Sequence, residues 1–388
     1  MNGKNILFVL ARAGMGGSCA SMINLLSLYK ERGITFDVFL MEHTGVWTQT
    51  VAQYGNLLPE DVALSAAIKE KSQLRGFRQY LHRLGFVLHH RLLGRDAGIA
   101  RVYKAAAKKL SNKYDHVIAY QESETTEFVS YIAAPHKIAW VHTDFRWYWD
   151  FAKKPDFLSG VYKSFDEIVC VTQSSLEGVI EKLQWDPNRV QVVKNTLPPK
   201  MIYEKACIPK EQTKKRDNQF LIVSIGRLNP EKAFHRIPRA AQKLKAAGCN
   251  FEWYVIGDGV TRQQIEEEIK DCDLGDCVLL LGAKMNPYPY IKEADCLVIT
   301  SVSEAQPMVA NEALILDKPV ISTEFASVRE VIKDGENGMI VQQTPEAIAE
   351  ALKEFMCDAQ LRQRLQDGAK AFCYNNDDVL AALDALLT

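Results

Sequence analysis

Short apolar segments followed at once by glycine recur in the second half of this 388-residue chain and strongly limit its fold. The segments are 220–225 before Gly226, 251–256 before Gly257 and 278–281 before Gly282. Apolar runs of this length are typical of strands that are buried on both faces of a parallel sheet. The carboxyl ends of such strands meet at one edge, where open α/β folds bind ligands. The pattern therefore predicts a ligand site at that edge.

The first half shows the same alternation of strands and helices. Its predicted strands are 5–10, 37–41, 116–120, 137–142, 167–172 and 190–194, and its first helix is 17–31. We predict an α/β fold with two doubly wound domains, because the chain exceeds the usual size of one core. The predicted divisions are a domain at 1–197, a polar linker at 198–218, a domain at 219–370 and a last helical segment at 371–388.

Two glutamates, Glu304 and Glu312, follow the apolar run 296–300. We expect Glu304 in a loop and Glu312 one turn inside a helix that begins near Met308. A carboxylate can accept both hydroxyls of a vicinal diol, and the free N–H groups of a helix start favour phosphate. Together they indicate a sugar nucleotide. Taken singly, each is also explained as a solvated loop residue or as a helix-dipole partner.

Two cations, Arg227 and Lys232, follow the predicted strand 220–225. Five residues apart in one loop, they can hold a diphosphate from two sides. A surface salt bridge is the alternative for Arg227.

In the first half, the loop with Gly16 and Gly17 precedes a helix and allows the backbone to approach a phosphate or an acceptor. Tight turns need glycine as well, so this loop is weaker evidence.

These motifs resemble glycosyltransferase family 4, of the type that builds bacterial cell-envelope polysaccharides. The residues that carry the resemblance are GRLNPEK at 226–232, Asn286-Pro287-Tyr288 after Gly282, the two glutamates and REVIKDGENGMIV at 329–341. In the first half it rests on the glycine loop and on 140–144, which contains His142 and Asp144. The sequence departs from the family at Ala233, where glycine usually follows the motif lysine.

The resemblance implies a GT-B fold, in which two Rossmann-like domains face a central cleft and a carboxy-terminal helix crosses back to the first domain. It also implies roles for single residues. The diphosphate would be held by Gly226, Arg227 and Lys232, and one of its phosphate oxygens by Met308 and Val309. The ribose would be bound by Glu312, and the base by Gly282 and Ala283. The donor sugar would be bound by Glu304 and His142. The enzyme would be retaining, would use a nucleotide sugar, with a UDP-sugar favoured, and would need no metal or other cofactor.

Composition limits the binding partners and the cellular location that we expect for the protein. The net charge of −1 gives no general attraction to nucleic acid. Nine cysteines without a C-x-x-C pair are typical of a reducing compartment, and Cys272 and Cys277 lack histidine partners for a metal. We expect neither a signal peptide nor a membrane-spanning helix, because the longest apolar runs are short. The expected location is the cytoplasm, and an acceptor in the envelope would bring the protein to the inner face of the membrane.

Residues 69–109 hold eleven Lys or Arg against two acidic residues, and leucines recur there at helical spacing. One interpretation is a basic amphipathic helix that contacts anionic lipid, aided by the aromatic run 145–149. The other is a helix whose leucines pack inward and whose basic face is solvated. A basic groove for a soluble anionic acceptor is a third.

The predicted function is sugar transfer from a nucleotide sugar to a glycan, lipid-linked or cell-envelope acceptor. Two alternatives stay open from the sequence. One is another GT-B enzyme, a phosphorylase or a sugar-nucleotide epimerase. The other is a non-catalytic GT-B-like subunit that binds glycans, which we would expect to lack several of Arg227, Lys232, Glu304 and Glu312.

Overall fold

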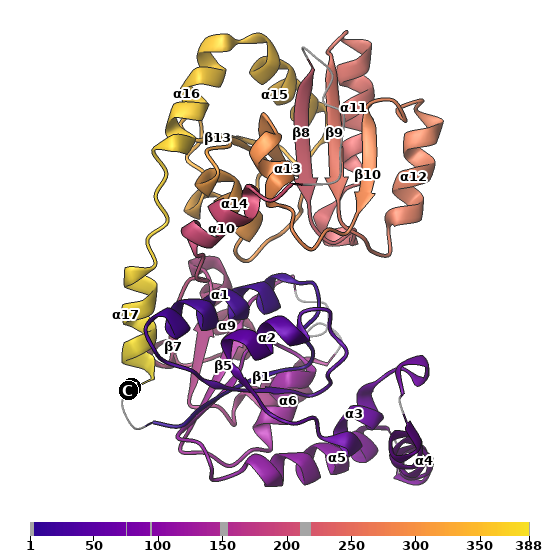
Figure 1. Cartoon of the computed structure of the whole chain (residues 1–388), viewed down its shortest axis with the longest axis vertical. Coiled ribbons are helices and arrows are strands. Elements are labelled where there is room, and N and C mark those ends of the chain that lie inside the picture. Colours follow the sequence, from indigo (N-terminus) through magenta and orange to yellow (C-terminus); the bar gives the residue numbers. More distant parts are fainter. Residues whose placement is uncertain (1–3, 75, 94, 148–153, 210–218, 388) are drawn as a thin grey trace. The chain divides into compact units, whose positions relative to one another are not determined.

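The computed structural model describes residues 4–74, 76–93, 95–147, 154–209 and 219–387. The chain folds into two compact units (Figure 1). Unit 1 contains Met1–Thr196 together with Asn376–Thr388, and unit 2 contains Leu197–Asn375. Each unit is a parallel sheet covered by helices, so the predicted fold class of two Rossmann-like domains is confirmed.

Within the described residues, unit 1 has a seven-stranded sheet in the order β3-β2-β1-β4-β5-β6-β7. The strands are β1 (Ile6–Leu10), β2 (Asp37–Leu40), β3 (Asn56–Leu57), β4 (His116–Ala119), β5 (His136–Val141), β6 (Glu167–Cys170) and β7 (Val190–Val192). The helices are α1 (Gly17–Glu31), α2 (Thr48–Tyr54), α3 (Val62–Ile68), α4 (Gly76–Leu93), α5 (Arg95–Leu110), α6 (Glu124–Ser130), α8 (Pro155–Tyr162), α9 (Gln173–Leu183) and α17 (Asp377–Leu386). Strand β1 pairs with β2 on one side and β4 on the other, so the strand order reverses beside β1.

Unit 2 has a six-stranded sheet in the order β10-β9-β8-β11-β12-β13 among its described residues. The strands are β8 (Phe220–Ile225), β9 (Phe251–Ile256), β10 (Val278–Gly282), β11 (Cys296–Ile299), β12 (Val320–Thr323) and β13 (Gly338–Val341). The helices are α10 (Pro199–Ala206), α11 (Arg236–Ala246), α12 (Arg262–Asp271), α13 (Tyr288–Glu293), α14 (Met308–Ile315), α15 (Pro345–Cys357) and α16 (Ala359–Lys370). Here the order reverses between β8 and β11, which places their carboxyl ends side by side.

The segment expected to be a linker, 198–218, begins instead with a helix. Helix α10 buries Ile202 and Ala206 and packs on α13 and α14, so it is part of unit 2. Two apolar positions four residues apart are enough for one helical contact. They are too few to produce a visible periodicity in the sequence. Residues 210–218 lie outside the described residues.

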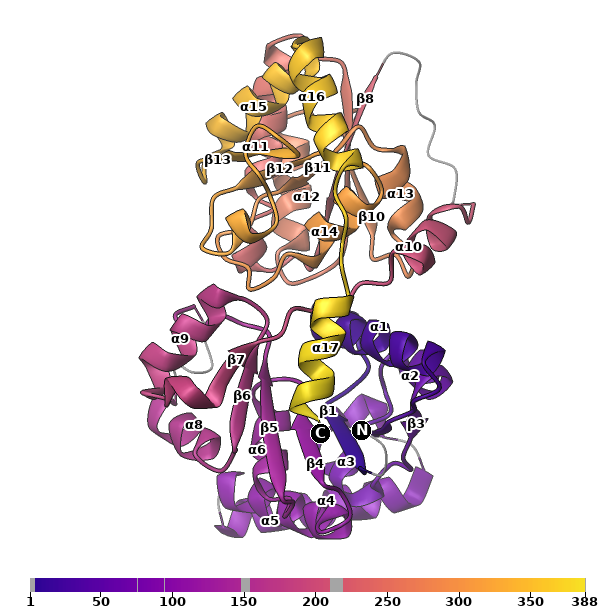
Figure 2. The same ribbon diagram turned by 90° about the vertical axis from the view of Figure 1, so that its left-hand side faces the viewer.

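The last helix, α17, belongs to unit 1, although it follows unit 2 in the chain. Its Val379 and Leu383 are buried. Asp384 accepts a hydrogen bond from the Tyr29 hydroxyl at 2.7 Å and pairs with Arg32 at 2.6 Å. These contacts fix α17 beside α1 (Figure 2).

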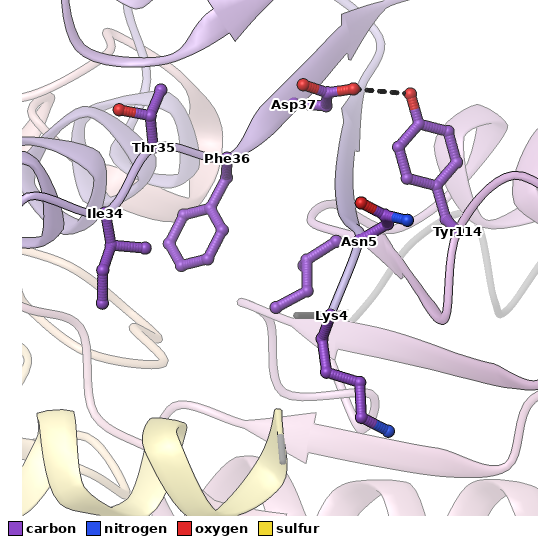
Figure 3. Close-up of a pocket in the computed structure, with 8 residues that line it drawn as sticks. Lys4, Asn5, Ile34, Thr35, Phe36, Asp37 and Tyr114 are labelled. Carbon is purple, nitrogen blue, oxygen red and sulfur yellow. Dashed lines mark hydrogen bonds between the residues drawn. The ribbon is translucent and has the colours of Figure 1, made fainter. Parts of the chain in front are cut away.

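A cavity of about 120 Å³ lies at the amino ends of β1 and β2 (Figure 3). Its lining includes Lys4, Phe36 and Asp37, and the Asp37 carboxylate accepts a hydrogen bond from Tyr114 at 2.7 Å. Ligands of open α/β sheets bind at the opposite, carboxyl edge. We therefore assign this cavity a packing role.

Candidate functional site

The candidate site of unit 2 is built where β8, β9 and β11 end. The loops after β8 and β9 touch backbone to backbone: Gly226 N–H donates to the Ile256 carbonyl at 3.0 Å. A Cβ added to Gly257 would lie 1.8 Å from the Gly226 carbonyl oxygen, and Gly257 has a φ of 151°. Only glycine fits there. The strand-then-glycine pattern thus reflects close loop packing at the predicted ligand edge.

Lys232 ends a short 3₁₀ turn, Pro230–Lys232, in the loop after β8. Its ammonium group contacts both carboxylate oxygens of Glu304, at 2.5 and 2.6 Å. The next residue, Ala233, adopts the left-handed conformation with a φ of 49°. That conformation explains why related sequences use glycine here, since glycine adopts it without strain. Ala233 adopts the same left-handed conformation at a cost in strain that glycine would not have.

Glu304 lies in the loop after β11, as predicted. The Ser301 hydroxyl donates to its carboxylate at 2.7 Å, and the Ser327 hydroxyl donates to its carbonyl at 2.8 Å. The same loop is fastened to the β8 loop, because the Thr300 hydroxyl donates to the Lys232 carbonyl at 2.7 Å. Motifs about 70 residues apart in sequence are thus joined into one surface.

Arg227 lies two residues after the end of β8, and its side chain is exposed. The structure gives no ion pair for it among the described residues, which argues against the surface salt bridge that the sequence left open. Its backbone neighbour Leu228 is buried and donates to the Asp258 carbonyl. Arg227 and Lys232 therefore share a rigidly anchored loop from which an exposed guanidinium can reach an anion.

Glu312 lies on α14 and is largely buried. The Tyr288 hydroxyl donates to its carboxylate at 3.1 Å. Burial raises the pKa of Glu312 to about 7, although Tyr288 and the nearby Lys205 of α10 both oppose the rise. Burial also lowers the pKa of Lys205. Neither Tyr288 nor Lys205 was a candidate from the sequence. Lys205 could not be, because its segment was interpreted as a linker.

Four further residues that were predicted to contact the donor lie at element ends of unit 2. Met308 and Val309 are the first residues of α14, and the preceding Pro307 provides no side-chain cap. The N–H groups at this helix start are thus available to an anion. Gly282 ends β10 in a left-handed conformation with a φ of 71°, and Ala283 follows it.

In unit 1, Gly16 is the residue before helix α1 and Gly17 is its first residue. No side chain caps this helix, and no acidic residue occupies its first turn. A Cβ added to Gly16 or Gly17 would meet no atom within 4 Å. Open space above uncapped N–H groups is the arrangement that an anion or a sugar needs.

His142 follows β5 at the carboxyl edge of unit 1. Its ring lies 5.0 Å from the ring of Tyr120 and 6.4 Å from that of Trp140. Burial lowers its pKa to about 3, so the ring is neutral at physiological pH and can exchange hydrogen bonds with a sugar but cannot act as a cation. Its backbone N–H donates to the buried carboxylate of Glu122, whose pKa burial raises.

Asp144 and Phe145 have structural roles. Asp144 is 2% exposed and accepts hydrogen bonds from Arg146, between 2.6 and 3.1 Å, and from Ser174. Phe145 is buried in the core, so the prediction that it anchors the protein at a membrane interface is wrong. Trp147 is 64% exposed, and residues 148 and 149 lie outside the described residues.

Arg12 is a further candidate for the site of unit 1, and sequence reasoning missed it. It follows β1, pairs with the buried Glu42 after β2 at 3.3 Å, and lies 3.9 Å from Glu124. Its side chain remains 53% exposed at the edge that carries the glycine loop. Its position directly after a buried strand was the available signal.

Residues 208–372 match the family of glycosyl transferases group 1. Unit 2 is a group 1 glycosyl transferase domain. Among curated relatives, the chain is 29% identical over 231 residues to N-acetylgalactosamine-N,N'-diacetylbacillosaminyl-diphospho-undecaprenol 4-alpha-N-acetylgalactosaminyltransferase of Campylobacter jejuni, covering 59% of this chain and 61% of that one. It is 33% identical over 139 residues to the amylovoran biosynthesis glycosyltransferase AmsK of Erwinia amylovora, covering 34% and 33%. The chain thus spans from one third to about three fifths of the length of these relatives.

Solved structures extend the likeness to the whole chain. Anabaena HepE in complex with UDP and glucose has a TM-score of 0.73 at 16% identity, covering 99% of this chain and 98% of that one. TarM has a TM-score of 0.75 at 12% identity, covering 100% and 99%. At such identities the likeness concerns the fold alone, and it shows that this chain has the GT-B fold of those structures.

Proposed function

We propose that this protein is a retaining glycosyltransferase that moves a sugar from a nucleotide sugar to a glycan, lipid-linked or cell-envelope acceptor. The observation that carries the proposal is the surface shared by the β8 and β11 loops. There Lys232 contacts Glu304, while Arg227 and the start of α14 belong to the same edge of the sheet. The group 1 family and the relatives named above support the reaction class.

The arrangement suits departure of a nucleoside diphosphate. Arg227, Lys232 and the N–H groups of Met308 and Val309 would neutralise charge as the bond from the anomeric carbon to phosphate oxygen breaks. Glu304 would exchange Lys232 for hydroxyls of the donor sugar. The acceptor oxygen would bond to the same face of the anomeric carbon, and the leaving phosphate would take its proton. A UDP-sugar is the favoured donor, because HepE is described in complex with UDP.

Glu304→Gln is expected to lower kcat by about 10²-fold with little change in KM for the donor. The carboxylate stabilises positive charge that develops on the sugar only in the transition state. Steady-state kinetics at several donor concentrations would measure both constants. A raised KM with unchanged kcat would show that Glu304 only binds the donor.

Catalysis is expected to need no metal ion, because Arg227, Lys232 and the helix start at Met308 would neutralise the departing diphosphate themselves. Transfer rates should be equal in excess EDTA, in Mg²⁺ and in Mn²⁺. Loss of activity in EDTA with recovery on adding a divalent cation would contradict this expectation.

The acceptor is proposed to be lipid-linked or part of the cell envelope, and the protein to work in the cytoplasm at the inner face of the membrane. The Campylobacter relative is named for a diphospho-undecaprenol substrate, and AmsK for amylovoran biosynthesis. No helix among the described residues is long and apolar enough to span a bilayer. A peripheral contact of residues 69–109 with anionic lipid would bring the enzyme to such an acceptor.

The deciding experiment measures binding and slow hydrolysis of a panel of UDP-, GDP- and ADP-sugars by the purified protein. We expect one donor to raise the melting temperature and to be hydrolysed, with the α-configuration of the released sugar detected by NMR before mutarotation if the donor is α-linked. Binding without hydrolysis or transfer would favour the non-catalytic subunit. A need for orthophosphate would favour a phosphorylase, and a changed donor sugar would favour an epimerase.

A further inference from the structure

Helix α4 is attached to unit 1 by polar contacts. It packs on α3 and α5 at one side of the unit (Figure 1). Gln79 is buried and donates to the Glu60 carboxylate at 3.3 Å. Arg83 donates to the carbonyls of Ala66 and Ala67 at 3.2 and 2.6 Å. Glu60 also accepts from the buried Lys69 at 2.6 Å, so the attachment of this helix depends on a charged hub.

The opposite face of α4 is apolar and exposed. Phe77, Leu81, Leu84 and Leu88 are 76%, 51%, 58% and 52% exposed, and Tyr80 is 49% exposed. Spacings of four, three and four residues place the first four on one stripe of the helix. A surface helix normally turns its apolar stripe to the core, whereas α4 exposes this stripe to solvent. The interpretation in which the leucines pack inward is therefore wrong for Leu81, Leu84 and Leu88.

The charge beside this stripe is positive. Arg78 and His82 lie one residue after Phe77 and Leu81, and they line a hollow of about 610 Å³ together with Lys109 and Lys113. The lining holds three cations, Arg78, Lys109 and Lys113, against Glu60 and Asp61, and Asp61 pairs with Lys109 at 2.7 Å. An apolar stripe with cations at its flank matches the acyl chains and anionic head groups of a lipid surface.

We propose that α4 is an interfacial membrane helix whose stripe of Phe77, Tyr80, Leu81, Leu84 and Leu88 inserts into an anionic bilayer surface. The helix would lie in the plane of the bilayer, with the stripe about 5–10 Å deep and Arg78 and His82 at the head groups. Glu60, Gln79 and Arg83 would hold its other face to unit 1. This inference rests on the proposed function, because a lipid-linked acceptor would lie in the same bilayer surface that α4 contacts.

The test compares vesicle binding of the full-length protein and a Phe77→Gln/Leu81→Gln/Leu84→Gln variant. We expect the wild type to sediment with vesicles of phosphatidylcholine and phosphatidylglycerol, and the variant to bind at least about tenfold more weakly. The variant should keep its melting temperature and its UDP-sugar hydrolysis, because the replaced side chains are exposed. Ile208→Gln/Val260→Gln is the matched control, since these residues are 53% and 82% exposed in unit 2, and it should bind like the wild type.

A second variant separates charge from insertion. The Arg78→Gln/His82→Gln variant should bind vesicles more weakly than the wild type at low salt. At high salt, where charge is screened, the variant and the wild type should bind equally. Equal binding by the wild type and the triple variant would overturn the proposal, as would a wild type that ignores anionic vesicles. So would a wild-type dimer that the triple variant converts to a monomer, because the stripe would then be a protein interface. If neither the wild type nor any variant hydrolysed a UDP-sugar while the wild type still bound vesicles, the proposed transferase activity would be refuted and the membrane helix would not.

Discussion

Replacing Arg227 and Lys232 together by alanine is expected to abolish sugar transfer while leaving the fold intact. Removing one preorganised contact to a leaving group costs about 10²–10³-fold in rate, and this variant would lose two. Arg227 is exposed, so its removal should change the free energy of unfolding little, whereas removal of Lys232 takes away the partner of Glu304 and should lower the melting temperature without unfolding the protein. The measurements are initial rates of transfer and the melting temperature of each protein.

Two further variants make this result specific. Lys333→Ala removes an exposed cation of the same unit that pairs with Glu336, and it should transfer at the wild-type rate. Arg227→Lys keeps the charge but not the planar fork, so its rate should lie between those of the wild type and Arg227→Ala. A folded double alanine variant with normal turnover would refute the assignment of the diphosphate site.

Glu312→Gln is expected to weaken nucleotide binding and, above pH 7, to stabilise the protein. The pKa of Glu312 is raised to about 7 by burial, whereas the unfolded chain has the ordinary value of 4.5. The folded state therefore holds this proton more tightly, and the stability that results is present below pH 4.5 and lost as pH rises through 7. Glutamine stays neutral, so the variant should gain up to about 3 kcal/mol at pH 8 and nothing near pH 4.5.

The affinity of the wild type for UDP should rise with pH, whereas the contribution of Glu312 to stability falls. If the ionised Glu312 accepts the ribose hydroxyls, the wild type should bind UDP more tightly at pH 8 than at about pH 5.5, where the carboxyl is protonated. The loss of affinity in Glu312→Gln should then be large at pH 8 and small at low pH. Calorimetric titration with UDP at both pH values measures it. Equal losses of UDP affinity at both pH values would show that the ionised Glu312 does not bind the ribose. A change in kcat alone would show that Glu312 has the role assigned to Glu304, and Glu304 that of Glu312.

Part of the site was predictable because it is encoded locally. Strands buried on both faces of a sheet read as short apolar runs, and residues directly after them must reach one edge. This reasoning placed Arg227, Lys232 and Glu304 on loops before their contacts were known. It also placed Met308 at a helix start, because Pro307 precedes an apolar helix. The fold class followed from the same alternation.

The contacts between these residues depended on the tertiary structure. Lys232 meets Glu304 only because β8 and β11 are neighbours in the sheet, an order that periodicity does not reveal. The raised pKa of Glu312 depends on burial beneath Tyr288 and α10, and α10 was hidden in a segment with two apolar positions. The lowered pKa of His142 likewise depends on burial beside the rings of Tyr120 and Trp140.

Helix α4 separates the two levels most clearly. Its sequence determined that a basic, amphipathic helix would form, because leucines at spacings of three and four align on one side of any helix. Which side faces the protein was decided by the tertiary structure alone. Glu60 and the carbonyl groups at the end of α3 accept hydrogen bonds from Gln79 and Arg83, so the face of α4 that carries these two residues turns inward. The leucines are left to solvent for that reason, since a helix cannot present both faces to one neighbour.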